Sequence, residues 1–206
     1  TCSGKARRIN VIMPFAYEAR TEDRKSSNES LDCAYMLQQL NSLGVANIIC
    51  FDPHDERIAN AVPLMGIDFP RSAYKIISTL FSSYDSLSLH KDKTIVVSPD
   101  ESGVNRGIFY SSMLNLPLGI FYRDRDYTQK INGEHPIKDY KFLGDDVNGK
   151  DILIIDDMIN SGSTMLRTSK KLKDAGAREV HVCISSPPVT DSCYYGMFED
   201  CQSLTT

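Results

Sequence analysis

Short, mostly apolar runs alternate along the chain with longer stretches in which apolar residues recur every three or four positions. The run at 151–155 is typical of a parallel strand covered on both faces. The stretch after Ser26 and Glu29, which form a capping-box pair, has helical spacing and closes at Gly44. Alternating strands and helices imply an α/β fold with doubly wound, mostly parallel sheets. The pattern predicts strands at 8–14, 45–51, 94–98, 117–122, 151–155 and 180–184, and further helices at 72–81, 103–114 and 165–176.

Residues 123–146 depart from this alternation. They are polar and charged, with little periodicity, and no element is expected there. An irregular stretch of this length within a compact domain is more typical of a functional loop than of a linker. We therefore expect a mobile loop that becomes ordered over bound substrates.

The segment 151–164, DILIIDDMINSGST, joins a strand, two carboxylates and a small polar turn that leads into a helix. Ligands of open α/β sheets bind at the carboxyl ends of strands, and helix N-termini attract phosphate. One sugar phosphate would satisfy both parts, with its hydroxyls on the carboxylates and its phosphate in the turn. A plain helix cap is the alternative, but an uncompensated charge pair at a buried strand end is costly. The expected binding residues are Asp156, Asp157, Asn160, Ser161, Gly162, Ser163 and Thr164.

A second polar segment, SPDESG at 98–103, also follows an apolar strand and precedes a helix. Its residue types are common in simple turns, which is the structural alternative. The functional interpretation is a backbone nest for pyrophosphate, with Asp100 near a magnesium ion or its water shell. The loop would consist of Asp100, Glu101, Ser102 and Gly103.

Two charged segments lie near the N-terminus. FDPHDER at 51–57 puts His54 beside two acids at the end of a strand, where it could contact a phosphate or a metal ion. YEARTEDR at 17–24 would ordinarily be a solvated loop. Because it follows a strand, its Arg20 could instead hold a nucleotide phosphate through a forked hydrogen-bond pair.

Composition limits the class of ligand. The chain has 206 residues, 41% of them hydrophobic and 24% charged, which is ordinary for a globular protein of one or two domains. A net charge of −4 provides no global field for nucleic acid, so we expect small ligands. The six cysteines form no C-x-x-C pair and indicate reduced packing residues in a cytoplasmic protein. No apolar run is long enough for a membrane span.

The segments RINVIMPFAYEARTEDRKSSNESLDC, FDPHDERI, VSPDESGV, GIFYRDRDYT and ILIIDDMINSGST occur in the order and approximate spacing found in ribose-phosphate pyrophosphokinases. From about 8 to 184 the chain resembles this family, also called PRPP synthetases, and looks most similar to its divergent bacterial branch. The resemblance implies two domains of the type I phosphoribosyltransferase fold, here 1–69 and 70–206, in a homo-oligomer. It also implies ATP binding by Arg20, Thr21 and His54, Mg²⁺ near His54 and Asp100, and catalysis by Arg123 and Arg125.

The chain departs from the family pattern at several of these positions. Arg123 replaces the usual Lys of the catalytic loop, and Asp124 lowers the positive charge of that loop, where it could pair with an arginine. Thr21 stands where Gln is expected, and Glu101-Ser102-Gly103 where two glycines are commoner. The family's N-terminal segment, which helps to form the adenine pocket, is expected to be missing, since the chain starts at Thr1 almost directly before a strand.

The expected reaction is transfer of the diphosphoryl group of MgATP to ribose 5-phosphate, which gives PRPP and AMP. One alternative is a phosphoribosyltransferase that consumes PRPP, because 185–197, SSPPVTDSCYYGM, resembles the end of glutamine phosphoribosylpyrophosphate amidotransferase. The other is a regulatory subunit that keeps the sugar-phosphate site without turnover. A nucleotide site around Arg20 and His54 would favour the pyrophosphokinase.

Overall fold

A computed structural model describes residues 6–24, 27–84, 87–126, 128–129, 136–159, 162–186, 201 and 203–205, apart from the side chains of Arg125 and Ile137. It divides the chain into two compact units, Thr1–Ser72 and Ala73–Thr206. Each unit has its own sheet. No helix among the described residues combines the length and hydropathy needed to cross a membrane.

The first unit is built on a three-stranded parallel sheet in the order β1-β2-β3. Its buried side chains include Cys33 and Leu37 of the first helix and Val45 and Ile48 of the second strand, so the core lies between helix and sheet. Together with the 3₁₀-helix η1, the elements are β1 (Ile9–Ile12), α1 (Asp32–Ser42), β2 (Val45–Ile49), η1 (Glu56–Ala61) and β3 (Gly66–Asp68).

The start of α1 differs from the expected capping box. The helix begins at Asp32, and its N-cap residue is Leu31, which offers no side-chain hydrogen bond. The Thr21 hydroxyl accepts a hydrogen bond from the Cys33 N–H at 3.1 Å instead, so a distant residue satisfies one free donor of the first turn. The expected C-terminal signal is confirmed, because Gly44 follows the helix with a φ of +82°.

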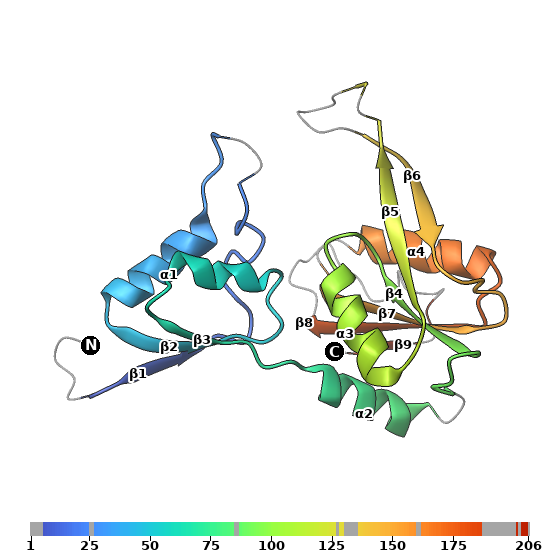
Figure 1. Ribbon diagram of the computed structural model, residues 1–206, viewed down its shortest axis with the longest axis horizontal. Coiled ribbons are helices and arrows are strands. Elements are labelled where there is room, and N and C mark those ends of the chain that lie inside the picture. Colours follow the sequence, from blue (N-terminus) through green and yellow to red (C-terminus); the bar gives the residue numbers. More distant parts are fainter. Residues whose placement is uncertain are drawn as a thin grey trace. The chain divides into compact units, whose positions relative to one another are not determined.

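The second unit contains a six-stranded sheet in the order β6-β5-β4-β7-β8-β9 (Figure 1). All neighbouring strands are parallel except β5 and β6. The elements are α2 (Ala73–Ser83), β4 (Thr94–Ser98), α3 (Val104–Leu114), β5 (Leu118–Arg125), β6 (Ile137–Leu143), β7 (Asp151–Met158), α4 (Ser163–Asp174), β8 (Glu179–Ser186) and β9 (Ser203–Thr205).

Side chains of β7 alternate between two hydrophobic cores, one on each face of this sheet. Ile152 and Ile154 pack in the cluster that includes Met165 and Leu172 of α4. Leu153 and Ile155 pack in the other cluster, which contains residues of α2 and α3. A strand covered on both faces must be apolar at successive positions. The doubly wound, mostly parallel fold expected from the sequence is therefore confirmed.

The stretch expected to be irregular, 123–146, is partly a two-stranded ribbon. β5 runs on to Arg125, and β6 pairs antiparallel with it, so that the two strands project beyond the rest of the sheet (Figure 1). The ring of Phe142 packs on that of Phe121 with centroids 5.2 Å apart, which attaches the base of the ribbon to the core. The expectation of a wholly irregular loop was wrong for these two strands.

Candidate functional site

The sheet order of the second unit places a ligand site between β4 and β7. The chain leaves β4 through α3 to reach β5 on one side, whereas β7 lies on the other side of β4. Adjacent parallel strands whose connections run in opposite directions leave a crevice at their carboxyl ends, where ligands of open α/β sheets bind. The segments 98–103 and 156–164 begin at these ends.

The two acids expected just after a strand lie within its last residues, because β7 continues to Met158. Pairing of Asp156 with Ile184 of β8 extends the hydrogen-bonded ladder beyond the apolar run. The Asp156 side chain is 15% exposed and that of Asp157 only 3%. A ligand at the strand end would therefore meet Asp156 first.

Arg106 of α3 supplies positive charge to the acidic pair. It is itself buried, and its Nη1 lies 3.7 Å from Asp156 Oδ1 and 3.6 Å from Asp157 Oδ1. Burial and the charge of Asp157 raise the pKa of Asp156 well above its ordinary value of 3.8, although Arg106 opposes the shift. One cation thus faces two carboxylates in a poorly solvated place, which leaves the Asp156 carboxyl unusually ready to take a proton.

The sequence interpretation did not include Arg106. A single arginine in a helical pattern is ordinary, and its helical position gives no sign that it faces the sheet. The available signal was its place one turn after the 98–103 segment. Residues three apart share a helix face, so Arg106 lies on the same side as Gly103.

The 98–103 loop approaches the acidic pair closely. A Cβ at Gly103 would lie 2.8 Å from Ser98 Oγ and 3.8 Å from Asp156 Oδ1, so a larger residue would disturb the loop. Asp100 Oδ1 accepts hydrogen bonds from the N–H groups of Ser102 and Gly103, at 3.0 and 3.2 Å, just before α3. Asp100 therefore shapes the turn, as the structural alternative supposed, and the same turn lies beside the proposed sugar-binding acids.

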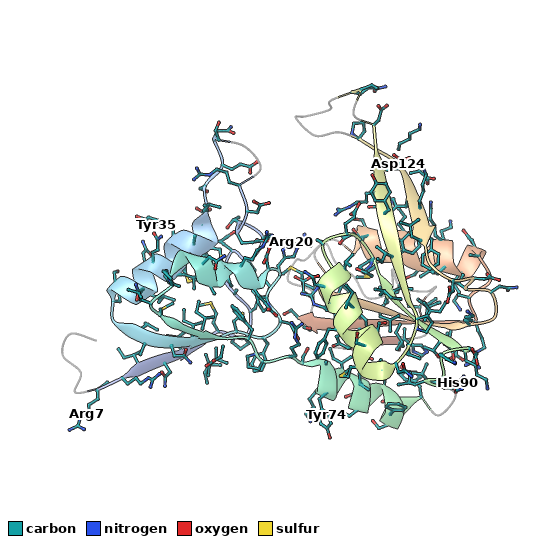
Figure 2. The ribbon with its side chains drawn as sticks, in the orientation of Figure 1. Arg7, Arg20, Tyr35, Tyr74, His90 and Asp124 are labelled. Atoms are coloured by element: carbon teal, nitrogen blue, oxygen red, sulfur yellow. The ribbon has the colours of Figure 1, made fainter. Side chains whose placement is uncertain are left out.

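Arg123 of β5 contacts this loop. Its Nε donates to Glu101 Oε2 at 2.9 Å, and its Nη2 lies 3.4 Å from Asp100 Oδ2. Asp124, which we expected could pair with an arginine, instead accepts a 2.7 Å hydrogen bond from Lys141 of β6. Figure 2 shows Asp124 on the projecting ribbon. Arg125 also belongs to β5, but its side chain is outside the described part of the structure.

The predicted phosphate turn is described only from Gly162 onward, so Asn160 and Ser161 lie outside the described residues. Gly162 is the N-cap of α4 and has a φ of +78°, a conformation that favours glycine. Ser163 and Thr164 are the first two residues of the helix, where backbone N–H groups have no intrahelical acceptor. These donors lie a few residues beyond Asp156 and Asp157, as a sugar-phosphate site requires.

The predicted nucleotide residues lie in the first unit. Arg20 is exposed (Figure 2). The Thr21 hydroxyl donates to the Glu18 carbonyl in addition to supporting α1, so its described hydrogen bonds are structural. His54 Nδ1 lies 2.6 Å from Oε1 of Glu22, a largely buried carboxylate that fixes the orientation of the ring. The sequence interpretation had not assigned Glu22 a role.

The two residues expected near Mg²⁺ lie in different units, His54 in the first and Asp100 in the second. Within the described part of the chain, no three His, Cys, Asp or Glu side chains are grouped to hold a metal ion. Asp100 is also engaged by its own loop and by Arg123. These residues do not fit a metal site made of protein ligands alone.

Residues 68–188 match the family of the phosphoribosyl transferase domain, which covers most of the chain and all of the strand ends just described. The chain belongs to this family. Its curated relatives include a ribose-phosphate pyrophosphokinase of a Nostoc species, 28% identical over 200 residues. Another from Staphylococcus aureus is 25% identical over 184 residues. The resemblance to the PRPP synthetase family is therefore confirmed.

These matches cover 95% and 87% of the chain but 56% and 52% of the relatives, so the chain spans about half the length of the curated relatives it matches. Among solved structures, the phosphoribosylpyrophosphate synthetase of Mycobacterium smegmatis superposes with a TM-score of 0.77 at 22% identity. That comparison covers 96% of this chain and 60% of the other, and it supports the fold.

Proposed function

We propose that this protein is a ribose-phosphate diphosphokinase that transfers the diphosphoryl group of MgATP to O1 of ribose 5-phosphate. The observation that carries the proposal is the acidic pair Asp156 and Asp157, which lies with Arg106 at the switch point of the sheet, directly before the N-terminus of α4. That arrangement supplies acceptors for vicinal sugar hydroxyls and donors for a phosphate a few residues further along.

The proposed roles follow from these positions. Asp156 and Asp157 would accept hydrogen bonds from the ribose hydroxyls, while residues 160–164 would hold the 5-phosphate. The 98–103 loop would cradle the transferring diphosphoryl group, and Arg123 and Arg125 would offset its charge. Arg20, Thr21 and His54 of the first unit would bind ATP.

Such a reaction needs little covalent chemistry from the protein. Most of the rate would come from holding the two substrates in line and from stabilising charge on the transferring oxygens. Mg²⁺ would arrive with the nucleotide, because this ion commonly keeps phosphate and water ligands and takes few from protein. That suits a site where the described residues offer no protein-only metal cage. We also propose a homo-oligomer, on the family resemblance, and a cytoplasmic location, on the absence of a C-x-x-C pair among the six cysteines.

The proposal is tested by incubating the protein with MgATP and ribose 5-phosphate and by separating the products chromatographically. Formation of both AMP and PRPP would support it. Formation of ADP, or cleavage of added PRPP by an amine, would instead assign the site to a different transferase.

A binding subunit without turnover is the second candidate function. It is favoured by the contacts of Arg123, which is held by Glu101 and Asp100. Binding of ribose 5-phosphate with no nucleotide product would support this candidate over the enzyme.

A further inference from the structure

Two acidic side chains bracket the guanidinium of Arg123. Glu101 Oε1 accepts from the backbone N–H of Arg123 at 2.8 Å, and Oε2 accepts from its Nε at 2.9 Å. Asp100 Oδ2 lies 3.4 Å from its Nη2. One of the two arginines expected to meet the diphosphoryl group is thus already neutralised by carboxylates of the pyrophosphate loop.

The contact with Glu101 also replaces a strand pairing. β4 ends at Ser98, which pairs with Ile120, so β5 continues past the end of its neighbour for several residues. The backbone N–H of Arg123 lies in this overhang and donates to the Glu101 side chain. The carboxylate therefore ties the projecting ribbon to the loop at two points, one through the backbone and one through the guanidinium.

We propose that Glu101 is an internal competitor at the diphosphate site, which occupies Arg123 until a diphosphoryl ligand displaces it. The inference rests on the proposed function. Carboxylate and phosphate oxygens compete for the same planar set of N–H donors. A diphosphoryl group has more charge and more acceptor oxygens than one carboxylate, so it can replace Glu101.

Ordinary protonation does not release this contact. Burial alone would raise the pKa of Glu101, but hydrogen bonds from the backbone and guanidinium of Arg123 outweigh it and hold that pKa below its ordinary value. Glu101 is therefore charged across the neutral range, and a competing anion is needed to free Arg123.

Asp124 provides a matched control within the same ribbon. It neighbours Arg123 in sequence and carries the same charge as Glu101, but it pairs with Lys141. Replacing it with Asn removes one negative charge from the ribbon and leaves the contact of Glu101 with Arg123 intact. A purely long-range charge effect would appear in both variants, whereas occupancy of Arg123 is specific to Glu101.

The test is calorimetric titration of inorganic diphosphate into the parent protein and into the Glu101→Gln, Glu101→Ala and Asp124→Asn variants. We expect both Glu101 variants to bind diphosphate about tenfold more tightly than the parent. In these variants the ligand no longer has to break a charge-assisted hydrogen bond between Glu101 and Arg123, and one such bond accounts for a change of about this size. Asp124→Asn should stay within about twofold of the parent, since its pair is exposed. Unchanged or weaker binding by both Glu101 variants, or an equal gain in Asp124→Asn, would overturn the inference.

Parallel assays of AMP formation separate this inference from the proposed function. If the Glu101 variants bind diphosphate more tightly but no AMP forms, the role of Glu101 is supported and the diphosphokinase activity is excluded. If AMP forms but all four proteins bind diphosphate equally well, the diphosphokinase activity is supported and the role of Glu101 is excluded. Absence of diphosphate binding in all four proteins would overturn both, because both place a diphosphate in this loop.

Discussion

Asp156 and Asp157 are neighbours in sequence but differ in what a ligand can reach. The Asp156 side chain is five times as exposed as that of Asp157, at 15% against 3%. Asp156 is therefore the better placed of the two to bind a sugar hydroxyl directly. Asp157 and Arg106 lie deeper and set the charge around it.

Replacing Asp156 with Asn should weaken binding of ribose 5-phosphate. Each lost charge-assisted hydrogen bond costs on the order of 1.5 to 3 kcal/mol, or roughly 10- to 150-fold in affinity. Calorimetry of the variant measures this, with the exposed Asp145→Asn as the control that should bind like the parent. Equal affinities in the parent and Asp156→Asn would remove Asp156 from the site.

The raised pKa of Asp156 also predicts a pH dependence. A ribose hydroxyl donates best to the ionised carboxylate, so the affinity for ribose 5-phosphate should rise as pH increases through that pKa. Calorimetry at several pH values tests this after correction for ionisation of the phosphate group. In Asp156→Asn the corrected affinity should lose this component, and its persistence would point to a different titrating group.

Arg106→Met should destabilise the protein, because it leaves two carboxylates without their buried cation. Loss of one partner of a buried ion pair typically costs about 3 to 5 kcal/mol at a pH where the acids are charged. Without Arg106, which lowers it, the pKa of Asp156 rises further. A raised carboxyl pKa favours the folded state below the unfolded pKa, and this advantage is lost as pH rises through the folded value.

The difference in unfolding free energy between the parent and Arg106→Met should therefore be small in acid and grow as pH rises. Urea unfolding at a series of pH values measures it. A difference that is constant across the series would show that Arg106 acts through packing and not through its charge.

At the scale of elements, the sequence pattern located most strands and helices but not all their ends. β7 extends beyond its apolar run because Asp156 and Met158 still pair with β8. The backbone hydrogen bonds of a sheet do not require apolar side chains. β6 was missed because its inward-facing Tyr140 and Phe142 alternate with Asp139 and Lys141, so a period of two is hidden in a polar stretch.

The candidate site was also predictable only in part, because some of its contacts join different elements. Asp100 and Gly103 follow a strand directly, so local order in the sequence reveals them. Arg106 beside the acidic pair and Glu101 beside Arg123 are contacts between different elements. Such contacts depend on the order of strands in the sheet, which the linear pattern does not specify.

β9 gives the second unit a pH-sensitive edge. His181 of β8 is fully buried, and its Nδ1 lies 2.8 Å from Ser203 Oγ of β9. Burial lowers the pKa of His181, although Glu179 opposes the shift. The unfolded chain therefore binds the proton more readily, so stability is full above the ordinary histidine pKa of about 6.5 and falls as pH decreases below it.

His181→Gln should remove part of the loss of stability that the parent shows as pH decreases. The unfolding free energy of the parent should fall between pH 7.5 and 5 by more than that of the variant, as measured in urea. His90→Gln is the matched control, because His90 is 59% exposed and should leave the slope of the parent unchanged. Equal slopes in the parent and His181→Gln would exclude this histidine as the source.

At the scale of the whole molecule, the proposed substrates belong to different units. The sugar-phosphate residues lie in 73–206, whereas Arg20 and His54 lie in 1–72. His54→Ala should therefore raise the Michaelis constant for ATP about tenfold, the cost of one charge-assisted hydrogen bond, and leave ribose 5-phosphate affinity unchanged. Steady-state kinetics combined with calorimetry test this. An equal loss for both ligands would indicate a general structural role for His54.

The central claim is that a diphosphoryl group, and not a single phosphoryl group, moves to ribose 5-phosphate at this site. Phosphorus NMR of the protein with MgATP and ribose 5-phosphate measures it most directly, because AMP, ADP and PRPP give separate signals. The proposal predicts AMP and PRPP in a one-to-one ratio, with both formed more slowly by Asp156→Asn. ADP together with a ribose bisphosphate, or no product although both substrates bind, would contradict it.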